Sequence, residues 1–249
     1  MNLEGENILV TGASRGIGKS IAIHLLKVNA QVGIHYNKGA TEATALKAKY
    51  PLSETFQADL SQMDQVQILF EKAKDHFGSI DTIVLNAGVF VPHLIEESTV
   101  QWLDIWRRTM AINLEAAGLL TKLGIEHFKS QGGGRFIYIG SRAAFRGETE
   151  EYLAYAASKG GLTSLSRTVA RSFGKYNIKS FVIAPGFTRT EMAEDAIRQY
   201  GEEKILGEMA LKELTTPEDI APIAVLMCSG QMDHATGSTI DINAGSYIR

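Results

Sequence analysis

A glycine-rich turn near the N-terminus constrains the fold more strongly than the rest of this sequence. The turn Thr11-Gly12-Ala13-Ser14-Arg15-Gly16-Ile17-Gly18 follows a short apolar run, Asn7–Thr11, and opens an amphipathic stretch, Ile17–Val28. An apolar run, a turn and an amphipathic stretch in this order predict a strand, a tight connection and a helix. Glycine lets such a turn close and lets another molecule approach the backbone. The chain is therefore expected to begin with a β-turn-α unit.

The same alternation continues to the C-terminus. Short apolar runs predict further strands, and the periodic stretches between them predict helices. The expected strands are Gln31–His35, Glu54–Ala58, Thr82–Asn86, Arg135–Gly140, Ser180–Ala184 and Thr239–Ile242, and the expected helices are Thr41–Tyr50, Ser61–Phe77, Thr99–Lys129, Tyr152–Tyr176 and one that starts at Pro217. Short apolar strands that alternate with helices indicate a parallel sheet covered on both faces. Since no linker or repeat interrupts the pattern, residues 1–249 are expected to form a single α/β domain.

Composition and charge exclude several classes of protein. Hydrophobic residues make up 45% of the 249 residues and charged residues 21%, which argues against disorder, collagen and coiled coil. The net charge of −3 gives no support for a nucleic-acid or membrane-binding surface. The chain shows neither a membrane-spanning stretch nor a signal-peptide pattern, so we expect a soluble, cytoplasmic protein.

Thiol and metal-binding residues are sparse. Cys228 is the one cysteine and adjoins the apolar run Ile220–Met227, so it is expected to be a small core residue. The 6 histidines are scattered and form no His-Glu-x-x-His motif. The sequence therefore predicts no metal site.

The glycine turn and the ends of the predicted strands form a candidate dinucleotide site. Glycines at this position let a pyrophosphate approach the backbone, and the helix N-terminus offers free N–H groups and a partial positive charge. Open α/β sheets bind ligands at the carboxyl ends of their strands. The expected cofactor-binding residues of this region are Gly12, Ser14, Arg15, Gly16, Ile17, Gly18, Asp59, Leu60, Asn86, Ala87 and Gly88. Taken singly, Asp59 could cap a helix, Asn86 could form a turn, and the glycine turn could be purely structural.

The second predicted strand ends without an acidic residue. An NAD site usually places an Asp or Glu about 20 residues after the glycines, on the ribose 2′-hydroxyl. Here His35-Tyr36-Asn37-Lys38 follows the strand, and the next acid is Glu42. Arg15, Asn37 and Lys38 suit a 2′-phosphate, so the sequence favours NADP(H) over NAD(H). Lys38 alone could equally be a solvated loop lysine.

Tyr155 and Lys159 lie one helical turn apart in the predicted helix Tyr152–Tyr176, so they share one face of it. A tyrosine has an ordinary pKa of about 10, and a nearby ammonium is expected to lower it. Ser141 follows a predicted strand and can bring its hydroxyl to the same point, while Asn113 could hold a water that relays protons. A Tyr–Lys pair alone is more often a surface feature; the serine and the upstream turn favour a catalytic group.

Together these motifs resemble the short-chain dehydrogenase/reductase family over essentially the whole chain, and within it the 3-oxoacyl-[acyl-carrier-protein] reductases. The resemblance rests on the turn Thr11–Gly18, Asp59, Asn86-Ala87-Gly88, Asn113, Ser141, Tyr155, Lys159 and Pro185-Gly186. It implies a Rossmann-type, doubly wound parallel sheet of seven strands in the order 3-2-1-4-5-6-7, and usually a homotetramer.

The resemblance also implies roles for these residues. Tyr155 would protonate the carbonyl oxygen during reduction, and Ser141 would stabilise the charge that develops on it. Lys159 would hold the nicotinamide ribose and lower the pKa of Tyr155, and Asn113 would support the proton relay. The backbone that would hold the nicotinamide is that of Pro185, Gly186 and Thr188.

The segment Arg142–Ala154 departs from the family pattern because it is slightly longer than usual. Tyr152 is therefore a second candidate for the role of Tyr155. Ala156 would then stand at the lysine position, which favours Tyr155.

Two arginines in this segment are also unusual for the family, which has mostly small or apolar residues there. Arg142 directly follows the candidate serine, and Arg146 lies one turn later. The functional hypothesis is that one of them contacts an anionic or polyhydroxy group of the substrate. The alternative, which we favour from the sequence, is that both pair with Glu148, Glu150 and Glu151 at the surface of the loop.

Two further segments bear on the substrate. Residues 188–214 are expected to form a mobile lid, because apolar residues recur there at helical spacing: Met192, Ile197, Tyr200, Ile205, Leu206 and Met209. Arg167, Arg171 and Lys175, with Lys129, form a basic stripe that could dock an acyl carrier protein or could be an ordinary solvated helix face.

The sequence thus predicts an NADP(H)-dependent oxidoreductase that reduces 3-oxoacyl thioesters. A sugar, polyol or other small-alcohol dehydrogenase of the same family is the first alternative. A catalytically silent cofactor-binding regulator is the second, and the intact set Asn113, Ser141, Tyr155 and Lys159 argues against it.

Overall fold

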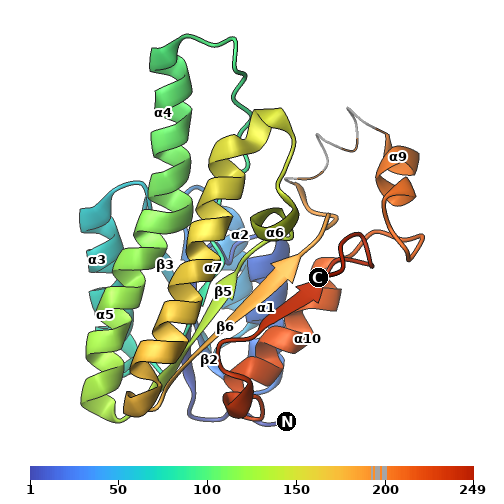
Figure 1. The fold of residues 1–249 in the computed structure, drawn as a ribbon. Coiled ribbons are helices and arrows are strands. Elements are labelled where there is room, and N and C mark those ends of the chain that lie inside the picture. Colours follow the sequence, from blue (N-terminus) through green and yellow to red (C-terminus); the bar gives the residue numbers. More distant parts are fainter. Residues whose placement is uncertain (192, 194–196, 198–200) are drawn as a thin grey trace.

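The computed structural model describes residues 1–191, 193, 197 and 201–249. In this part of the chain, seven strands form one parallel sheet in the order β3-β2-β1-β4-β5-β6-β7 (Figure 1). The strands are β1 (Asn7–Val10), β2 (Gln31–Tyr36), β3 (Ser53–Gln57), β4 (Thr82–Leu85), β5 (Gly134–Ile139), β6 (Ile178–Pro185) and β7 (Thr239–Ile242). The predicted doubly wound α/β fold and its strand order are confirmed.

Helices cover both faces of this sheet (Figure 1). They are α1 (Gly16–Lys27), α2 (Ala40–Lys49), α3 (Met63–Phe77), α4 (Thr99–Met110), α5 (Ala116–Gln131), α6 (Ala143–Arg146), α7 (Leu153–Phe173), α9 (Glu202–Gly207) and α10 (Pro217–Cys228). None of these described helices has the length and apolar character needed to cross a membrane.

The core consists of two apolar layers, one on each side of the sheet. Because successive strand residues point to opposite faces, Ile8 and Val10 pack on the side of α1, α2 and α10, while Leu9 packs on the side of α3, α5 and α7. The central strands, which are buried on both faces, are mostly apolar, as the sequence pattern indicated. Cys228 is fully buried in the first layer, as predicted for a small core residue.

The long predicted helix Thr99–Lys129 is two helices joined by a π-helical turn, Ala111–Glu115. A π turn inserts one extra residue per turn and often marks a functional position. Apolar spacing does not reveal it, because the flanking helices keep their own periodicity. The turn carries Asn113, so it sets the direction of that side chain.

Two other boundaries differ from the predictions. The helix predicted from Ser61 starts at Met63, and Ser61 donates two hydrogen bonds to the Asp59 carboxylate. Strand β6, predicted as Ser180–Ala184, spans Ile178–Pro185. A proline can end a strand because it lacks only its own N–H, and Pro185 lies opposite Ile242 of β7.

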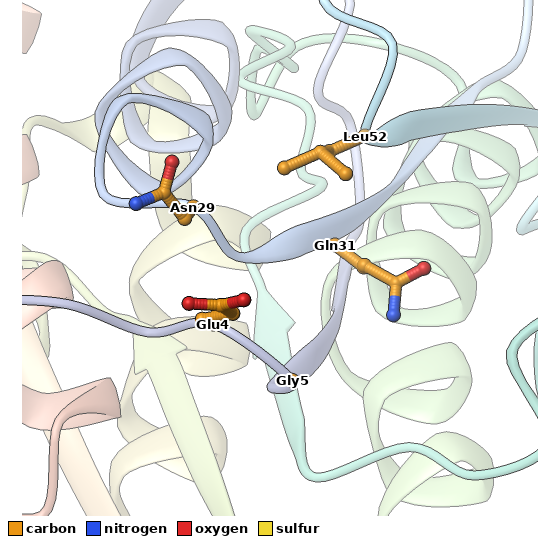
Figure 2. A pocket seen from close by; sticks show the side chains of 5 residues that line it. All are labelled: Glu4, Gly5, Asn29, Gln31 and Leu52. Carbon is orange, nitrogen blue, oxygen red and sulfur yellow. The ribbon is translucent and has the colours of Figure 1, made fainter.

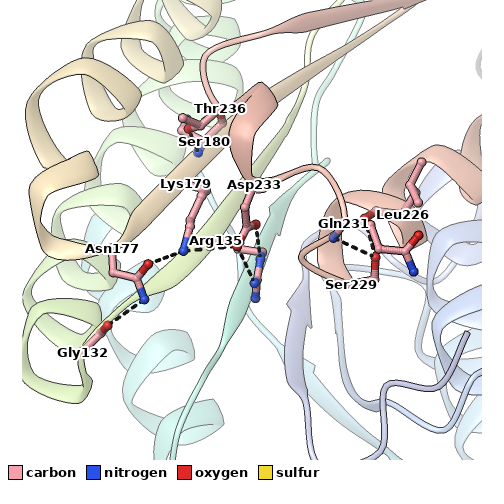
Figure 3. Close-up of polar contacts among 10 residues, drawn as sticks. All are labelled: Gly132, Arg135, Asn177, Lys179, Ser180, Leu226, Ser229, Gln231, Asp233 and Thr236. Atoms are coloured by element: carbon pink, nitrogen blue, oxygen red, sulfur yellow. Dashed lines mark hydrogen bonds and ion pairs between the residues drawn. The ribbon is translucent and has the colours of Figure 1, made fainter.

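A polar cluster joins β5 and β6 to the turn before β7, at the amino ends of the strands (Figure 3). Arg135 forms a double hydrogen bond with Asp233, at 2.9 and 3.0 Å, and Lys179 lies 3.2 Å from the same carboxylate. Burial alone would raise the pKa of Asp233, but these two cations outweigh it and hold that pKa below its usual value. Asn177 then connects Lys179 to the carbonyl of Gly132. The cluster therefore stabilises the amino ends of these strands, which lie opposite the site described next.

Candidate functional site

A cavity of about 740 Å³ lies at the carboxyl ends of the central strands. In doubly wound sheets, ligands bind at the carboxyl ends of the strands, at the point where the strand order reverses. In this chain that point lies between β1 and β4. The predicted site residues that line it are Gly12, Ser14, Arg15, Gly16, Ile17, Asn37, Lys38, Asp59, Leu60, Asn86, Ala87, Gly88, Ser141, Arg142, Tyr155, Lys159, Pro185, Gly186 and Thr188. Gly18 and Asn113 are the predicted site residues that do not line it. The sequence had missed other lining residues, including His35, Glu42, Phe90, Arg108 and Glu148.

The glycine turn is held in place by Asn86 at the end of β4. The Asn86 side-chain amide donates to the carbonyls of Thr11, at 2.8 Å, and Gly12, at 3.1 Å. Gly12 and Gly16 have φ angles of +64° and +54°, which glycine adopts without strain. A Cβ on Gly18 would lie 2.3 Å from the Gly12 carbonyl oxygen. Gly18 does not line the cavity; its lack of a side chain lets the first turn of α1 approach the glycine turn closely.

His35 supports the same turn from β2. Its ring is 2% exposed, Nδ1 accepts a hydrogen bond from the Gly12 N–H at 2.9 Å, and Nε2 lies 3.1 Å from the Ala58 carbonyl. These partners require a neutral ring with its proton on Nε2. Burial lowers the pKa of His35 to about 4. The signal in the sequence was a single polar ring within an otherwise apolar strand.

The buried neutral ring of His35 predicts a loss of stability in acid. Its pKa rises from about 4 in the folded chain to 6.5 in the unfolded chain, so the unfolded state binds more protons as the pH falls. The contribution is complete above pH 6.5, and about 3 kcal/mol of it is lost by pH 4. We expect urea unfolding at both pH values to show an acid loss smaller by about this amount in His35→Gln. Equal acid losses in the two proteins would contradict the prediction.

The end of the cavity beside β2 and α2 carries charges of both signs. Asn37 and Lys38 line it as predicted, and Arg15 lies there too, 3.0 Å from Glu191 on the exposed surface. Glu42, in the first turn of α2, lines the same region. The end of β2 therefore has no carboxylate of its own, but one approaches from the next helix.

Asp59 forms a turn that precedes α3. One carboxylate oxygen accepts hydrogen bonds from the N–H and the hydroxyl of Ser61, at 2.9 and 2.8 Å. These bonds, together with Asn37 and the charge of Arg108, keep the pKa of Asp59 below its usual value. Asp59 is therefore an ionised acceptor at the wall of the cavity.

The end of the cavity beside β5 and α7 brings together Ser141, Tyr155 and Lys159. Ser141 follows strand β5. Its oxygen accepts a hydrogen bond from the N–H of Ala143 at 3.1 Å, and its hydroxyl acts on the phenol of Tyr155 in the direction that lowers the pKa. The Lys159 ammonium donates to the carbonyl of Ile139 at 2.7 Å and lies 5.7 Å from the centre of the Tyr155 ring. The three polar groups thus come from one strand end and one helix face.

The pKa values of this group are governed by burial. Burial lowers the pKa of Lys159 to about 8. Burial also raises the pKa of Tyr155, although the Ser141 hydroxyl and the Arg142 charge act in the opposite direction. The sequence had predicted a lowered tyrosine pKa. That expectation is wrong, because removal of water from the phenol outweighs the neighbouring groups that lower the pKa.

Asn113 lies behind the cavity wall. Its side chain exchanges two hydrogen bonds with the backbone of Val89, at 2.8 and 3.0 Å, and donates to Ser158 at 3.1 Å. Gly88 separates it from Lys159: a Cβ there would lie 3.3 Å from the Asn113 oxygen and 3.5 Å from the lysine nitrogen. The π turn therefore uses Asn113 to anchor the segment that follows β4.

The two candidate tyrosines have different surroundings. Tyr155 lines the cavity and meets the edge of Phe90, with ring centres 4.7 Å apart. Tyr152 stacks face to face on Phe90 at 3.7 Å. This geometry favours Tyr155 as the acid and makes Phe90 a support for both rings.

Of the two arginines after Ser141, Arg146 forms a loop pair that the sequence favoured, with Glu148, but Arg142 does not. Arg142 lines the cavity and is 7% exposed. It lies 3.5 Å from Glu208, which also contacts Arg146 at 3.3 Å, while Arg146 reaches Glu148 at 3.6 Å. The sequence could not indicate Glu208, because this residue comes from the segment that follows β6.

That segment contains the predicted lid, residues 188–214. Met192 and Tyr200, like residues 194–196, 198 and 199, lie outside the described residues. Its two ends are pinned together by a bridge between Thr188 and Thr215. In the described part, α9 ends beside Glu208, and Met209 is buried.

The predicted basic stripe lies away from the cavity of its own chain. Arg171 is about 24 Å further along α7 than Tyr155, at a rise of about 1.5 Å per residue. Lys129 and Lys175 instead approach the ring of Tyr176, at 4.5 and 5.2 Å. Arg167 lies 5.7 Å from the centre of the Phe145 ring in α6. None of these four side chains lines the cavity.

A second hollow, of about 360 Å³, lies at the opposite edge of the sheet (Figure 2). It is lined by Glu4, Gly5, Asn29, Gln31 and Leu52, which precede or begin the first three strands. Glu4 is its one ionisable group, so it offers no constellation for catalysis. Among the described residues, no group of three or more His, Cys, Asp and Glu side chains is placed to hold a metal ion.

The chain is similar to known oxidoreductases along its length. A family model described as enoyl-(acyl carrier protein) reductase matches residues 12–246. The 3-oxoacyl-[acyl-carrier-protein] reductase of Pseudomonas aeruginosa is 32% identical over 252 residues, covering 100% of both chains. The L-rhamnose 1-dehydrogenase (NAD(P)(+)) of a Sphingomonas species is 30% identical, covering 99% of this chain and 98% of the relative.

Solved structures have the same fold. A short chain dehydrogenase from Burkholderia cenocepacia in complex with NADP superposes with a TM-score of 0.89, at 28% identity and 99% coverage of both chains. A 7α-hydroxysteroid dehydrogenase complexed with NADH and 7-oxo glycochenodeoxycholic acid gives a TM-score of 0.91 at 27% identity, covering 98% of this chain and 95% of the other.

Proposed function

We propose, from the premise that this chain belongs to the short-chain dehydrogenase/reductase family of NAD(P)-dependent oxidoreductases, that it reduces 3-oxoacyl thioesters with NADPH. The observation that carries the proposal is the convergence of Ser141, Tyr155 and Lys159 in a cavity that extends to the glycine turn. A sequence that only bound the cofactor would not need this group. The family relatives include both thioester reductases and a sugar dehydrogenase, so the substrate class is the part to be tested.

The turn is suited to a dinucleotide. Gly12 and Gly16 expose backbone at the N-terminus of α1, and Gly18 leaves no side chain where strand and helix meet. Such a cradle accepts a pyrophosphate through N–H groups and the helix dipole. Arg15, Asn37 and Lys38 would hold the 2′-phosphate, which is why we propose NADP(H) over NAD(H).

Each residue at the end of the cavity beside β5 and α7 has its own role in carbonyl reduction. A bound nicotinamide supplies the hydride to the carbonyl carbon. Tyr155 donates its proton to the carbonyl oxygen, and Ser141 donates a hydrogen bond to the same oxygen. Burial raises the pKa of Tyr155, which keeps the phenol in the protonated form that an acid requires. Lys159 holds the ribose, and its charge stabilises the phenolate that remains after proton transfer.

Substrate, partner and assembly follow from the same proposal. Residues 188–214 act as the lid that selects the substrate. An acyl carrier protein presents the thioester, and the enzyme works as a homotetramer in the cytoplasm, in fatty acid synthesis. The second candidate function is a sugar or polyol dehydrogenase, which the polar cavity residues Arg142 and Glu148 favour.

The test of the proposed function is a paired substrate assay that follows nicotinamide absorbance. We expect acetoacetyl thioester to be reduced. The reduction should be faster with NADPH than with NADH, because Arg15 and Lys38 would hold the 2′-phosphate that only NADPH carries. The reverse assay offers NADP⁺ or NAD⁺ with a panel of polyols and sugars. Turnover in the reverse panel alone would replace the thioester by the second candidate. Cofactor binding without turnover on either panel would instead support a regulator.

A further inference from the structure

We propose that Arg142 forms an anion subsite beside Tyr155, so that the enzyme also reduces small oxoacids whose free carboxylate lies close to the reacting carbonyl. The inference rests on the hydride transfer of the proposed function but not on its thioester substrate. The reaction converts the C=O of the oxoacid to CH–OH. NADPH supplies the hydride and is oxidised, Tyr155 supplies the proton, and the carboxylate is unchanged.

Arg142 is a buried cation without a full set of partners. Its side chain is 8% exposed, and its Nη1 atom has no hydrogen-bond partner among the described residues. A buried guanidinium nitrogen that donates to nothing is costly, so native proteins seldom keep one without a use. The residue also lines the cavity, so a ligand there can supply the acceptor.

Among the residues that the structure describes, the carboxylate that contacts Arg142 is a weak partner. Glu208 lies 3.5 Å from Nη2, beyond the roughly 2.7–2.9 Å of a charge-assisted hydrogen bond. It is half exposed and divides its charge between Arg142 and Arg146. Glu148, the other nearby acid, lies 3.6 Å from Arg146. A substrate carboxylate at hydrogen-bond distance would therefore be a closer partner for Arg142 than Glu208 is.

The backbone places this cation next to the reacting carbonyl. Arg142 directly follows Ser141, and its N–H donates to the carbonyl of Pro185 at 3.0 Å. The Ser141 hydroxyl and the Arg142 charge both act on the phenol of Tyr155, each in the direction that lowers its pKa. An anion bound by Arg142 therefore belongs near the carbonyl and not at the end of a long acyl chain.

The test uses oxoacids and their isosteric amides, which differ in charge but hardly in shape. The probes are 3-oxobutanoate and 3-oxobutanamide, with 2-oxobutanoate and its amide as a second pair. We expect wild-type kcat/KM to favour an acid over its amide by about 10- to 100-fold, the range of a buried charge-assisted hydrogen bond. In Arg142→Gln the ratio should fall close to one. The ratio does not depend on the fraction of folded enzyme, so a poorly folding variant still gives an answer.

Arg146→Gln is the matched control. It removes the same charge and shares Glu208, but Arg146 does not line the cavity, so the acid-to-amide ratio should stay as in the wild type. Glu208→Gln should raise the ratio several-fold, because it removes the competing carboxylate. Calorimetric titration of each probe into the protein with NADP⁺ measures binding without turnover, and there the acid should bind about 10-fold or more tightly.

The outcomes separate the two proposals. A wild-type ratio near one, in both kcat/KM and binding, would overturn the anion subsite even if thioesters or amides are reduced. A ratio that survives in Arg142→Gln would overturn it as well. Oxidation of NADPH by none of the acids, amides or thioesters would defeat the proposed function, and the subsite with it.

Discussion

Tyr155→Phe should lower the rate of carbonyl reduction by about 10³-fold or more while NADPH still binds. The substitution removes only the phenol hydroxyl, on which the Ser141 side chain acts, so the acid is lost. The ring remains, with its edge-on contact to Phe90 at 4.7 Å, and the fold is expected to persist. The measurements are kcat with the best substrate and the NADPH dissociation constant from fluorescence.

Tyr152→Phe is the control for this result. It keeps the ring that stacks on Phe90 at 3.7 Å and removes a hydroxyl from a residue that does not line the cavity. We expect it to keep more than a tenth of wild-type turnover. If Tyr155→Phe were near normal while Tyr152→Phe was inactive, the two tyrosines would have been assigned in the wrong order.

The fold was predictable because each of its units is encoded within a short stretch of chain. The apolar run before Gly12 and the amphipathic stretch after it define a strand and a helix without reference to the remainder of the sequence. The same locality placed Ser141 at a strand end and Tyr155 with Lys159 on one helix face. These residues therefore share the cavity that the sequence predicted for them.

The contacts that hold the site together were not predictable, because they join distant parts of the chain. His35 reaches the N–H of Gly12 across two paired strands, and the sequence showed only a polar residue in an apolar run. Glu208 reaches Arg142 from just after α9, more than sixty residues along the chain, so the alternative of local pairs with the loop glutamates looked simpler. The pKa of Tyr155 also escaped prediction, since spacing identifies a charged neighbour but not the extent of burial.

Gly18→Ala should cause the largest loss of stability among the turn variants. Gly18 is not among the glycines with positive φ, so an alanine could adopt its backbone conformation. The obstacle is space: the new Cβ would lie 2.3 Å from the Gly12 carbonyl oxygen and 2.4 Å from the Asn86 amide nitrogen. Relief requires movement of the turn backbone and loss of the Asn86 hydrogen bonds. We expect a cost of about 3 kcal/mol, a Tm lower by about 10 °C, and NADPH binding weakened by about 100-fold.

Alanine variants at two other glycines distinguish the effect of a steric clash from that of an unfavourable φ angle. At Gly16 a Cβ would make an ordinary contact, 3.5 Å from Thr190, but φ is +54°, so alanine should cost only about 1 kcal/mol. Gly174 has a helical φ of −54° and no atom within 4 Å of a Cβ, so its alanine variant should be close to wild type. Thermal melts and NADPH titrations of the three variants should rank them Gly18, Gly16, Gly174. If Gly18→Ala melted and bound NADPH like Gly174→Ala, the contact of Gly18 with the turn would not be what holds the cofactor cradle together.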